Sequence, residues 1–261
     1  MSDVSRQRGQ HWRAETPVTT SQELVALSEG RLEAVGRLVE ASNATLYCEL
    51  TPPDGLLPDG TEGGLHAIYK PVRGERPLAD FPDGTLAQRE LAAWLVSEAT
   101  GWAIVPPTVI RDGPFGRGMV QLWVDADPDV DLIALVLLRD TRLRQMALLD
   151  AAMNNADRKA SHILPTVDGD LHGCDHGICF ASEPKLRTVL WGWAGEPISG
   201  PERAALVRLE AALAGELAER LDEQLSRAEV EALRERAARL VNEGRFPLPD
   251  RDRRVIPWPP F

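Results

Sequence analysis

The sequence predicts an α+β fold in which a small antiparallel sheet is followed by a helical half. Two observations indicate this class. Segments of alternating apolar or strand-forming residues are concentrated before Asp125, where they are separated by turns rich in Pro, Gly and Asp. After Asp125 the apolar residues follow helical spacing. We therefore expect a sheet lobe over residues 1–124, of which 1–17 are weakly ordered, and a helical lobe over residues 125–261, with a ligand cleft between them.

The first half should contain a short helix, five strands and a longer helix. Thr20 and Glu23 fit a capping box that opens a helix through Leu27. The longer helix has a mostly apolar face from Leu86 to Val96 and ends at Gly101. The strands are expected at residues 31–39, 45–50, 65–70, 107–111 and 118–124, with turns at residues 41–44 and 112–114.

The second half should be mainly helical. Ser226 and Glu229 match a capping box, and Gly244 is suited to end the helix that follows it. Helices are expected from residue 127, over residues 141–153 and through residues 202–243, with two short strands inside residues 162–180 and a Pro-rich tail at residues 245–261.

Composition excludes several classes of partner. The chain has 261 residues and a formal charge of −11, which argues against nucleic acid as a partner and against broad docking on an anionic membrane. No apolar run approaches the ~18 residues that span a bilayer, and the polar N-terminus does not resemble a secretory signal. Three scattered cysteines cannot form a disulfide framework. We therefore expect a cytoplasmic protein without integral membrane association.

Lysine is rare in this arginine-rich chain, so a lysine at a given position suggests that its compact ammonium group has a chemical role there. The 29 basic residues include only Lys70, Lys159 and Lys185. Lys70 ends the third expected strand, and Glu90 follows twenty residues later on the next helix. A lysine that contacts nucleotide phosphates, held by an acid, is one requirement of phosphoryl transfer. A surface lysine at a strand end and a solvated glutamate are the structural alternatives.

Two acidic loops supply the other requirements of that chemistry. Asp157 lies in the stretch Asn154–Leu164 after a helix, and Asp175 follows eighteen residues later, before Gly177. One carboxylate can orient or deprotonate an attacking hydroxyl while the other holds the metal that neutralises phosphates. Alternatively, Asp157 and Arg158 form an ion pair that ends a helix.

These loops resemble kinase motifs. Asp157-Arg158-Lys159-x-x-His162-Ile163-Leu164 resembles the D-R-H-x-x-N-[IL]-[ML] catalytic loop of phosphatidylinositol 3-/4-kinases, and Asn155-x-Asp157-Arg158 resembles the loop of bacterial HipA-type kinases. Asp175-His176-Gly177 is similar to the D-x-G metal motif of both. With residues 185–193, the pattern resembles a family of small bacterial phosphatidylinositol 3-/4-kinase-like proteins over most of the chain. The resemblance implies a bilobal protein-kinase-like fold.

The resemblance also implies residue roles. Asp157 would be the catalytic aspartate, Lys159 a cation near the transferred phosphate, and Asp175 a magnesium ligand. The nucleotide would be held by Lys70 paired with Glu90, by backbone N–H groups of Ser42 and Asn43, and by a linker that meets adenine and includes Gln121, Trp123 and Val124. Ser42 and Asn43 are equally ordinary turn residues.

His162 departs from the motif, because the larger kinases place asparagine there. Imidazole offers the metal a nitrogen, which suits Mn²⁺ or Zn²⁺ better than Mg²⁺. Either one metal is bound differently, or Mn²⁺ is preferred, or catalysis is impaired. A structural zinc site is a weaker alternative, because the spacing of the nearby residues matches no paired-ligand pattern. These residues are His172, Cys174, Asp175, His176 and Cys179.

We expect an ATP-dependent phosphotransferase that uses Mg²⁺ or Mn²⁺ and transfers the γ-phosphate to a hydroxyl of a protein, lipid or small molecule. A protein or small polar acceptor is favoured over a phosphoinositide, because the chain is acidic and shows no lipid-binding module. The alternative is a nucleotide-binding pseudokinase that acts as a regulatory module, which His162 and Lys159 favour.

Overall fold

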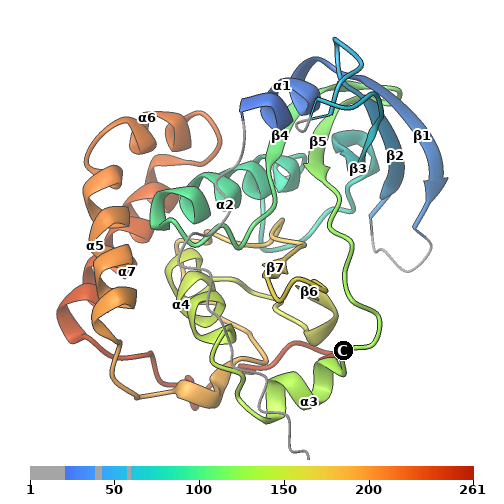
Figure 1. Ribbon diagram of the computed structural model, residues 1–261. Helices are drawn as coiled ribbons and strands as arrows, with labels where there is room; N and C mark the ends of the chain where they lie inside the picture. Colours follow the sequence, from blue (N-terminus) through green and yellow to red (C-terminus); the bar gives the residue numbers. More distant parts are fainter. Residues whose placement is uncertain (1–20, 39–42, 58–59) are drawn as a thin grey trace, which may run out of the picture.

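The computed structural model describes residues 21–38, 43–57 and 60–261, and Figure 1 shows their arrangement. Five antiparallel strands form one sheet in the order β1-β2-β3-β5-β4. Their bounds are β1 (Arg31–Arg37), β2 (Leu46–Thr51), β3 (Leu65–Pro71), β4 (Thr108–Gly113) and β5 (Gly116–Leu122). Helix α1 (Ser21–Glu29) packs against β4 and β5.

The β3–β5 pair brings the end of β3 close to its neighbour. Lys70 pairs with Met119, and Pro71, expected to stop the strand, still pairs with Gly118. A Cβ atom at position 118 would lie 2.5 Å from the Lys70 carbonyl oxygen, so only glycine permits this approach. The β4–β5 turn occupies residues 114–115 and so starts two residues later than the sequence predicts. Strand β4 extends two residues further than expected, to Gly113, and β5 both begins and ends two residues earlier than expected.

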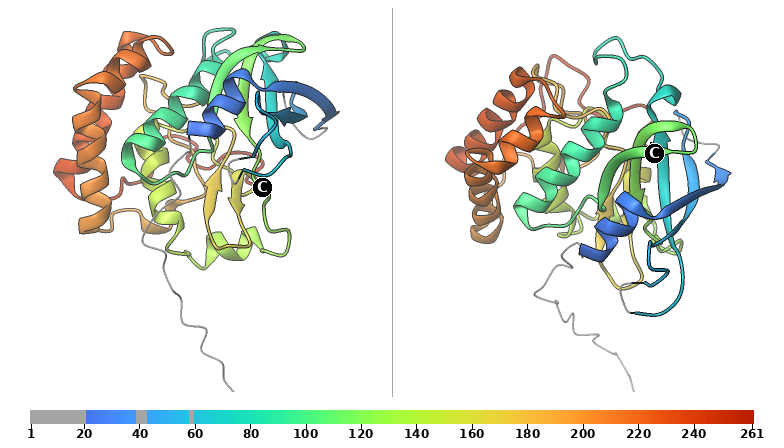
Figure 2. Two further views of the ribbon diagram at one scale, coloured as in Figure 1. Left: turned by 45° about the horizontal axis from the view of Figure 1, so that its top comes forward. Right: turned by 90° about the horizontal axis from the view of Figure 1, so that it is seen from above.

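Helix α2 (Leu86–Thr100) lies between the sheet and the other helices (Figures 1 and 2). Its backbone N–H groups at Leu86 and Ala87 donate to the Glu75 carboxylate at 3.1 and 2.9 Å, which satisfies two free donors of the first turn. The helix ends as predicted at Gly101, whose φ of 72° is accessible to glycine without strain.

The helical half contains α3 (Leu132–Leu137), α4 (Leu143–Met153), α5 (Gly200–Leu213), α6 (Glu216–Asp222) and α7 (Arg227–Glu243). A two-stranded hairpin of β6 (Ile163–Pro165) and β7 (Leu171–Gly173) follows α4. The Ser226–Glu229 capping box and the Gly244 cap are confirmed. The stretch expected to be helical through residues 202–243 is divided into three helices, because the chain turns at Gly215 as well as before the predicted cap at Ser226.

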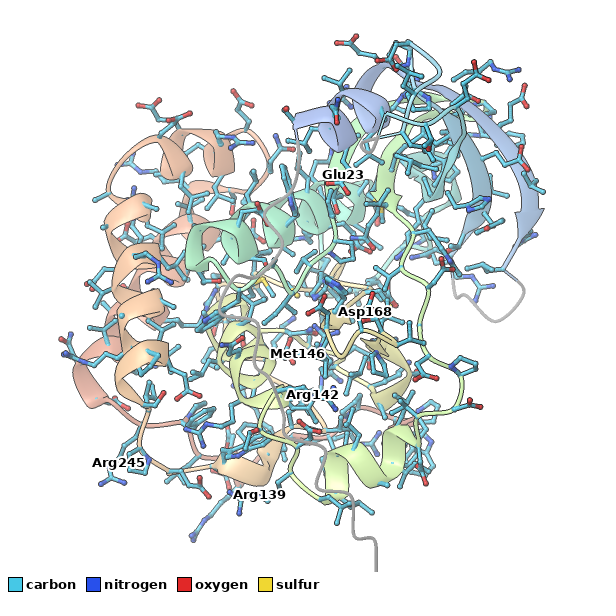
Figure 3. The ribbon with its side chains drawn as sticks, in the orientation of Figure 1. Glu23, Arg139, Arg142, Met146, Asp168 and Arg245 are labelled. Atoms are coloured by element: carbon cyan, nitrogen blue, oxygen red, sulfur yellow. The ribbon has the colours of Figure 1, made fainter. Side chains whose placement is uncertain are left out.

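Each half has its own apolar core. The sheet core packs α1 on one face of the sheet through buried side chains that include Leu27, Leu50 and Tyr69. The larger core gathers α2, α4, α5 and α7, with Met146 of α4 fully buried inside it (Figure 3). Full burial of a leucine or methionine stabilises the folded chain by about 1.5–3 kcal/mol.

The C-terminal tail lies against the helical half. The Ala160 N–H donates to the Pro260 carbonyl at 2.9 Å, and the Thr188 N–H donates to the Val255 carbonyl at 3.0 Å. The tail therefore runs beside the residues that follow Asp157.

The predicted α+β fold, a small antiparallel sheet lobe followed by a helical lobe, is confirmed by this architecture. The division at residue 124 remains a prediction. The Thr20 cap, the order of residues 1–17 and the position of Ser42 lie outside the described residues. Within the described ranges, no helix combines the length and the apolar character that crossing a membrane requires.

Candidate active site

Three side chains from distant parts of the sequence meet between the two lobes. The Lys70 Nζ atom lies 2.6 Å from Glu90 Oε1 and 2.9 Å from Asp175 Oδ1. Lys70 ends β3, Glu90 lies on α2, and Asp175 follows β7. The pairing of Lys70 with Glu90 that the sequence suggested is therefore present, and Asp175 joins it.

Strand and helix geometry explain why these side chains converge. Ala67 and Tyr69 of β3 are buried in the sheet core, so alternation turns Lys70 to the opposite face. Glu90 is only 2% exposed because α2 lies between the lobes. A buried carboxylate needs a charged or hydrogen-bonding partner, and Lys70 supplies one.

The charges of this cluster reinforce one another. Burial alone would lower the pKa of Lys70, but the carboxylates of Asp175 and Glu90 outweigh it and raise that pKa above its ordinary value. The Lys70 ammonium in turn holds the pKa of Asp175 well below its usual range, against the effect of burial. Both groups are therefore ionised at neutral pH.

Glu90 also connects the lobes through its second oxygen. The His176 backbone N–H donates to Glu90 Oε2 at 2.9 Å. One carboxylate thus holds the sheet lobe through Lys70 and the residue after Asp175 through its backbone. The position of Asp175 is thereby coupled to α2.

Asp157 lies on the loop after α4 together with Lys159. The Asp157 backbone N–H donates to Asn155 Oδ1 at 2.9 Å, and Lys159 Nζ lies 3.1 Å from Asp157 Oδ2. Burial raises the pKa of Asp157, and Lys159 acts in the opposite direction. The charge of Asp175 also raises this pKa, so the two carboxylates lie within electrostatic range.

His162 faces the other side of Asp175. Its Nε2 atom lies 3.5 Å from Asp175 Oδ2, while its Nδ1 atom is buried without a hydrogen-bond partner among the described residues. Burial lowers the pKa of His162 to about 4. The ring is therefore neutral at pH 7 and keeps a nitrogen lone pair.

A buried ion pair, which sequence reasoning missed, fixes the loop that carries Asp157. Arg158 and Asp150 are both fully buried, with Nε–Oδ2 and Nη2–Oδ1 distances of 3.0 and 2.9 Å. Arg158 Nη1 also donates to the Cys174 carbonyl at 3.0 Å, and Nη2 lies 2.6 Å from His176 Nε2. The residues on both sides of Asp175 are thus tied to the loop of Asp157.

A pocket opens beside these charges. The pocket is small and partly open to solvent. Asn43, one of the predicted phosphate-binding residues, lines it, although its side-chain oxygen accepts from the Arg76 N–H at 2.9 Å. The other lining residues are Lys70, Pro71, Glu75, Leu86, Ala87, Glu90, Asp175 and Gly177.

The predicted adenine linker does not line this pocket. Gln121 is buried and its Nε2 atom donates to Thr108 Oγ1 at 2.8 Å, so its side chain ties β5 to β4. Trp123 Nε1 donates to Asp125 Oδ1 at 2.7 Å, and its backbone N–H donates to the His66 carbonyl. Val124 is half-buried after the end of β5. Any contact of these three residues with adenine remains a prediction.

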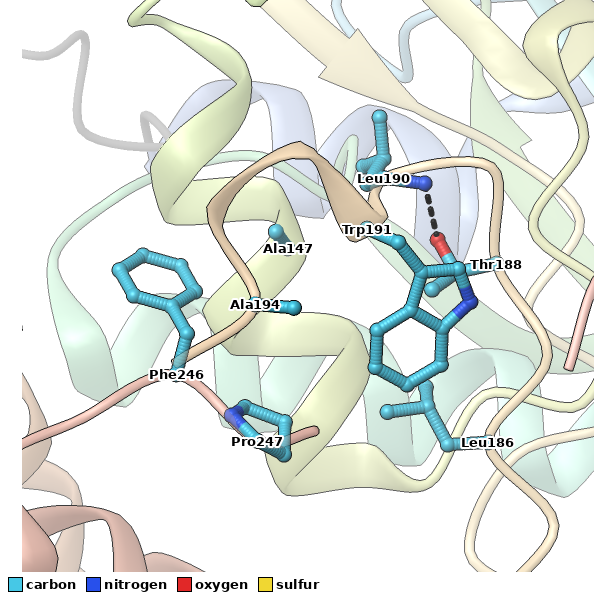
Figure 4. A pocket seen from close by; sticks show the side chains of 8 residues that line it. All are labelled: Ala147, Leu186, Thr188, Leu190, Trp191, Ala194, Phe246 and Pro247. Atoms are coloured by element: carbon cyan, nitrogen blue, oxygen red, sulfur yellow. Dashed lines mark hydrogen bonds between the residues drawn. The ribbon is translucent and has the colours of Figure 1, made fainter. Parts of the chain in front are cut away.

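A second pocket, shown in Figure 4, lies between α4, the segment of residues 186–194 and the start of the C-terminal tail. Its residues carry no ionisable side chain, so it offers no charge to a phosphate. They are Ala147, Leu186, Thr188, Leu190, Trp191, Ala194, Phe246 and Pro247.

Within the described part of the chain, no group of three or more His, Cys, Asp and Glu side chains is placed to hold a metal ion. The residues of the alternative zinc site have other contacts: His172 Nδ1 lies 3.1 Å from the Ala103 carbonyl, and His176 contacts Arg158. His162 and Asp175 form a pair of donors rather than a complete site.

Comparison with known proteins adds sequence relatives to this geometry. No protein-family profile matches the chain. Protein Rv2133c of Mycobacterium tuberculosis is 47% identical over 274 residues, which cover 92% of this chain and 95% of that protein. Phosphatidylinositol 4-kinase gamma 4 of Oryza sativa subsp. japonica is 29% identical over 180 residues, which cover 54% of this chain.

The match spans only 32% of the rice kinase. A solved structure, that of the Helicobacter pylori proinflammatory kinase CtkA, is 10% identical, with a TM-score of 0.47, and covers 84% of this chain and 94% of its own. The distant similarity to the rice protein supports a kinase-like superfamily. At 47% identity over almost its full length, the chain belongs to the same family as Protein Rv2133c of Mycobacterium tuberculosis.

Proposed function

We propose that this protein is a kinase that transfers the γ-phosphate of ATP to a hydroxyl group. The observation that carries the proposal is the ion-paired cluster of Lys70, Glu90 and Asp175 at a pocket between the lobes. A lysine held by a helix carboxylate, with an acidic metal ligand beside it, is the arrangement that phosphoryl transfer needs. The distant similarity to phosphatidylinositol 4-kinase gamma 4 of rice agrees with this chemistry.

Each side chain has a defined part in the transfer. Lys70 binds the nucleotide phosphates, and Glu90 keeps its ammonium in place. The acceptor hydroxyl oxygen forms a bond to the γ-phosphorus while its proton passes to the Asp157 carboxylate. The bond between the γ-phosphorus and the bridging oxygen breaks, and ADP leaves with that electron pair. Lys159, 3.1 Å from Asp157, offsets charge on the transferred phosphate.

Asp175 and His162 fit a divalent cation that ATP phosphates also bind. Their nearest donor atoms are 3.5 Å apart, and a metal ligand must present a deprotonated atom, which the neutral His162 ring does. Mg²⁺ commonly takes one or two protein ligands and completes its shell with phosphates and water. When bound, such a cation neutralises charge on the phosphates. An oxygen and nitrogen donor pair favours Mn²⁺ over Mg²⁺.

ATP turnover by the purified chain tests the proposal. Hydrolysis or transfer is measured with Mg²⁺ and with Mn²⁺ for the wild type, Asp157→Asn, Asp175→Asn and the control Asp168→Asn. Asp168 lies exposed on the β6–β7 turn (Figure 3), so its variant should retain full turnover. Turnover should fall at least a hundredfold in the other two variants, because general-base and metal contributions are each about 10²-fold or more. Equal turnover in all four proteins would overturn the site.

His162 favours a second candidate function, that of a nucleotide-binding pseudokinase. Its half-buried ring offers a nitrogen at the position where the resembled kinase motif has the amide oxygen of asparagine. Nucleotide binding without turnover in either metal, together with unchanged behaviour of Asp157→Asn, would favour this regulatory module over the enzyme.

A further inference from the structure

The segment that follows Asp175 returns to run beside the loop of Asp157. The Arg187 N–H donates to the Asn155 carbonyl at 2.9 Å, and the Arg158 N–H donates to the Arg187 carbonyl at 3.0 Å. The Val189 N–H then donates to the Arg158 carbonyl at 3.0 Å. These bonds form a parallel bridge between Arg158 and Thr188. Arg187 is therefore the lateral neighbour of Asp157.

This register sorts the side chains onto two faces. Arg158 and Thr188 both reach Asp150 in the interior, with Nη2–Oδ1 and Oγ1–Oδ2 distances of 2.9 and 3.5 Å. Successive side chains of paired extended segments alternate between faces, so Asp157 and Arg187 share the opposite face. Electrostatics agree: while burial raises the pKa of Asp157, the charge of Arg187 acts to lower it.

Arg187 is half-buried and has no ion-pair or side-chain hydrogen-bond partner in the described ranges. The neighbouring cations are satisfied: Lys159 lies 3.1 Å from Asp157 Oδ2 and Lys185 lies 3.0 Å from Asp80 Oδ2. The chain has 40 acidic and 29 basic residues, so carboxylates to pair with Arg187 are plentiful. A guanidinium kept half-buried without one is available to an oxyanion from outside.

We propose that Arg187 binds an oxyanion of the acceptor, so that the preferred acceptor is an alcohol that also carries a phosphate group. This inference rests on the proposed kinase function. The hydroxyl of such a molecule would lie at Asp157, which takes its proton as the oxygen bonds to the γ-phosphorus and ADP departs. The planar guanidinium suits this task because it donates two parallel hydrogen bonds to one phosphate. The phosphate could belong to a free metabolite or to a lipid headgroup, which share this chemistry.

Binding of a probe tests Arg187 independently of turnover. Saturation-transfer NMR measures the dissociation constants of glycerol 3-phosphate and of glycerol for the full chain. Glycerol 3-phosphate should bind at least tenfold more tightly than glycerol. Arg187→Ala should weaken its binding at least tenfold and Arg187→Lys by less, since lysine keeps the charge without the fork. Arg220→Ala is the control, because Arg220 is an exposed arginine of α6 and its loss changes net charge equally.

The outcomes separate the two proposals. If Arg187→Ala and Arg220→Ala bind glycerol 3-phosphate within twofold of the wild type, the Arg187 site is overturned, whatever the turnover of ATP. Binding that depends on Arg187 without ATP turnover upholds the anion site and rejects the kinase. Because the Arg187 backbone bonds do not involve its side chain, Arg187→Lys should keep the wild-type thermal midpoint. That variant therefore remains informative should Arg187→Ala fold poorly.

Transfer of labelled phosphate from ATP identifies the source of the oxyanion. The acceptors are free glycerol 3-phosphate, glycerol, and phosphatidylglycerol in phosphatidylcholine vesicles. A KM for glycerol 3-phosphate that rises at least tenfold in Arg187→Lys, with a smaller change in kcat, supports a soluble acceptor. Transfer confined to the phosphatidylglycerol vesicles, and lowered by the same variant, supports the lipid source. Equal efficiency with glycerol and glycerol 3-phosphate would overturn the inference.

Discussion

The Asp150–Arg158 ion pair gives a stringent test of how the loop of Asp157 is held. Asp150→Asn keeps the shape of the side chain but removes its charge. Arg158 is fully buried and stays protonated at any pH of interest, so its charge would remain in the interior without a counterion. The same change weakens the bond from Asn155 Nδ2, now 2.9 Å from Asp150 Oδ1.

Burial sets the expected magnitude. Breaking a buried pair by removing one partner costs about 3–5 kcal/mol, because the remaining charge is uncompensated. Asp140 and Arg142 form a comparable pair at the surface, with side chains 27% and 33% exposed, and Arg142 is labelled in Figure 3. An exposed pair contributes about 0–1 kcal/mol. Asp140→Asn is therefore a control of matched chemistry and different burial.

Urea denaturation at pH 7, followed by circular dichroism, measures both changes. Asp150→Asn should lose several-fold more free energy of unfolding than Asp140→Asn. The double variant Asp150→Asn/Arg158→Met should recover part of the loss, because it removes the stranded charge. A cost below about 1 kcal/mol for Asp150→Asn would refute the argument that this pair anchors the loop.

Two further predictions concern stability. Burial alone would raise the pKa of Glu202, but hydrogen bonds from Arg144 and Ser199 outweigh it and hold this pKa below its ordinary value in the folded chain. The Glu202 carboxylate therefore stabilises the folded chain at pH values above its ordinary pKa of about 4.3, and this stabilisation is lost as the pH falls through the lower pKa of the folded state. Glu202→Gln should consequently flatten the decline of the urea midpoint between pH 6 and pH 3. Asn154 has a φ of 54° and its side chain contacts the Ala181 and Glu183 carbonyls at 2.8 and 2.7 Å. Asn154→Ala should cost about 2–4 kcal/mol of unfolding free energy, from lost bonds and left-handed strain, and Asn154→Gly should cost less because glycine tolerates that φ; equal costs would contradict the strain argument.

The parts of the site that could be predicted from the sequence are those whose residue types are unusual in their position. A rare lysine at a strand end and an acid on the next helix suggested a pair, and Lys70 does contact Glu90 at 2.6 Å. The contact of Lys70 with Asp175 crosses 105 positions and depends on how the lobes close, which no local pattern encodes. The predicted roles of these residues in catalysis stay predictions.

The sequence around Asp150 contained a sign of a buried ion pair that the sequence analysis did not use. It lies in α4 among Leu148, Leu149, Ala151 and Ala152, where a charge on an apolar helix is costly unless it is paired. That pattern predicts a buried partner, although it cannot say that the partner is Arg158. Turn positions were less predictable, because Asp112-Gly113-Pro114 favours a turn at any of its residues and the β3 pairing decides where β5 begins.

The backbone at Asp175 links this architecture to the proposed chemistry. Asp175 has a φ of 60°, a left-handed conformation that costs a non-glycine residue about 1–3 kcal/mol. Such strain persists only where the surroundings determine the conformation, and here both neighbours are held: the Cys174 carbonyl by Arg158, and the His176 N–H by Glu90. Because Glu90 also holds Lys70, the same two contacts set the carboxylate of Asp175 against the ammonium. A glycine at position 175 would make the fold more stable, because it adopts this φ without strain. The costly conformation, held by two buried charged groups, therefore indicates that the Asp175 carboxylate is needed for function.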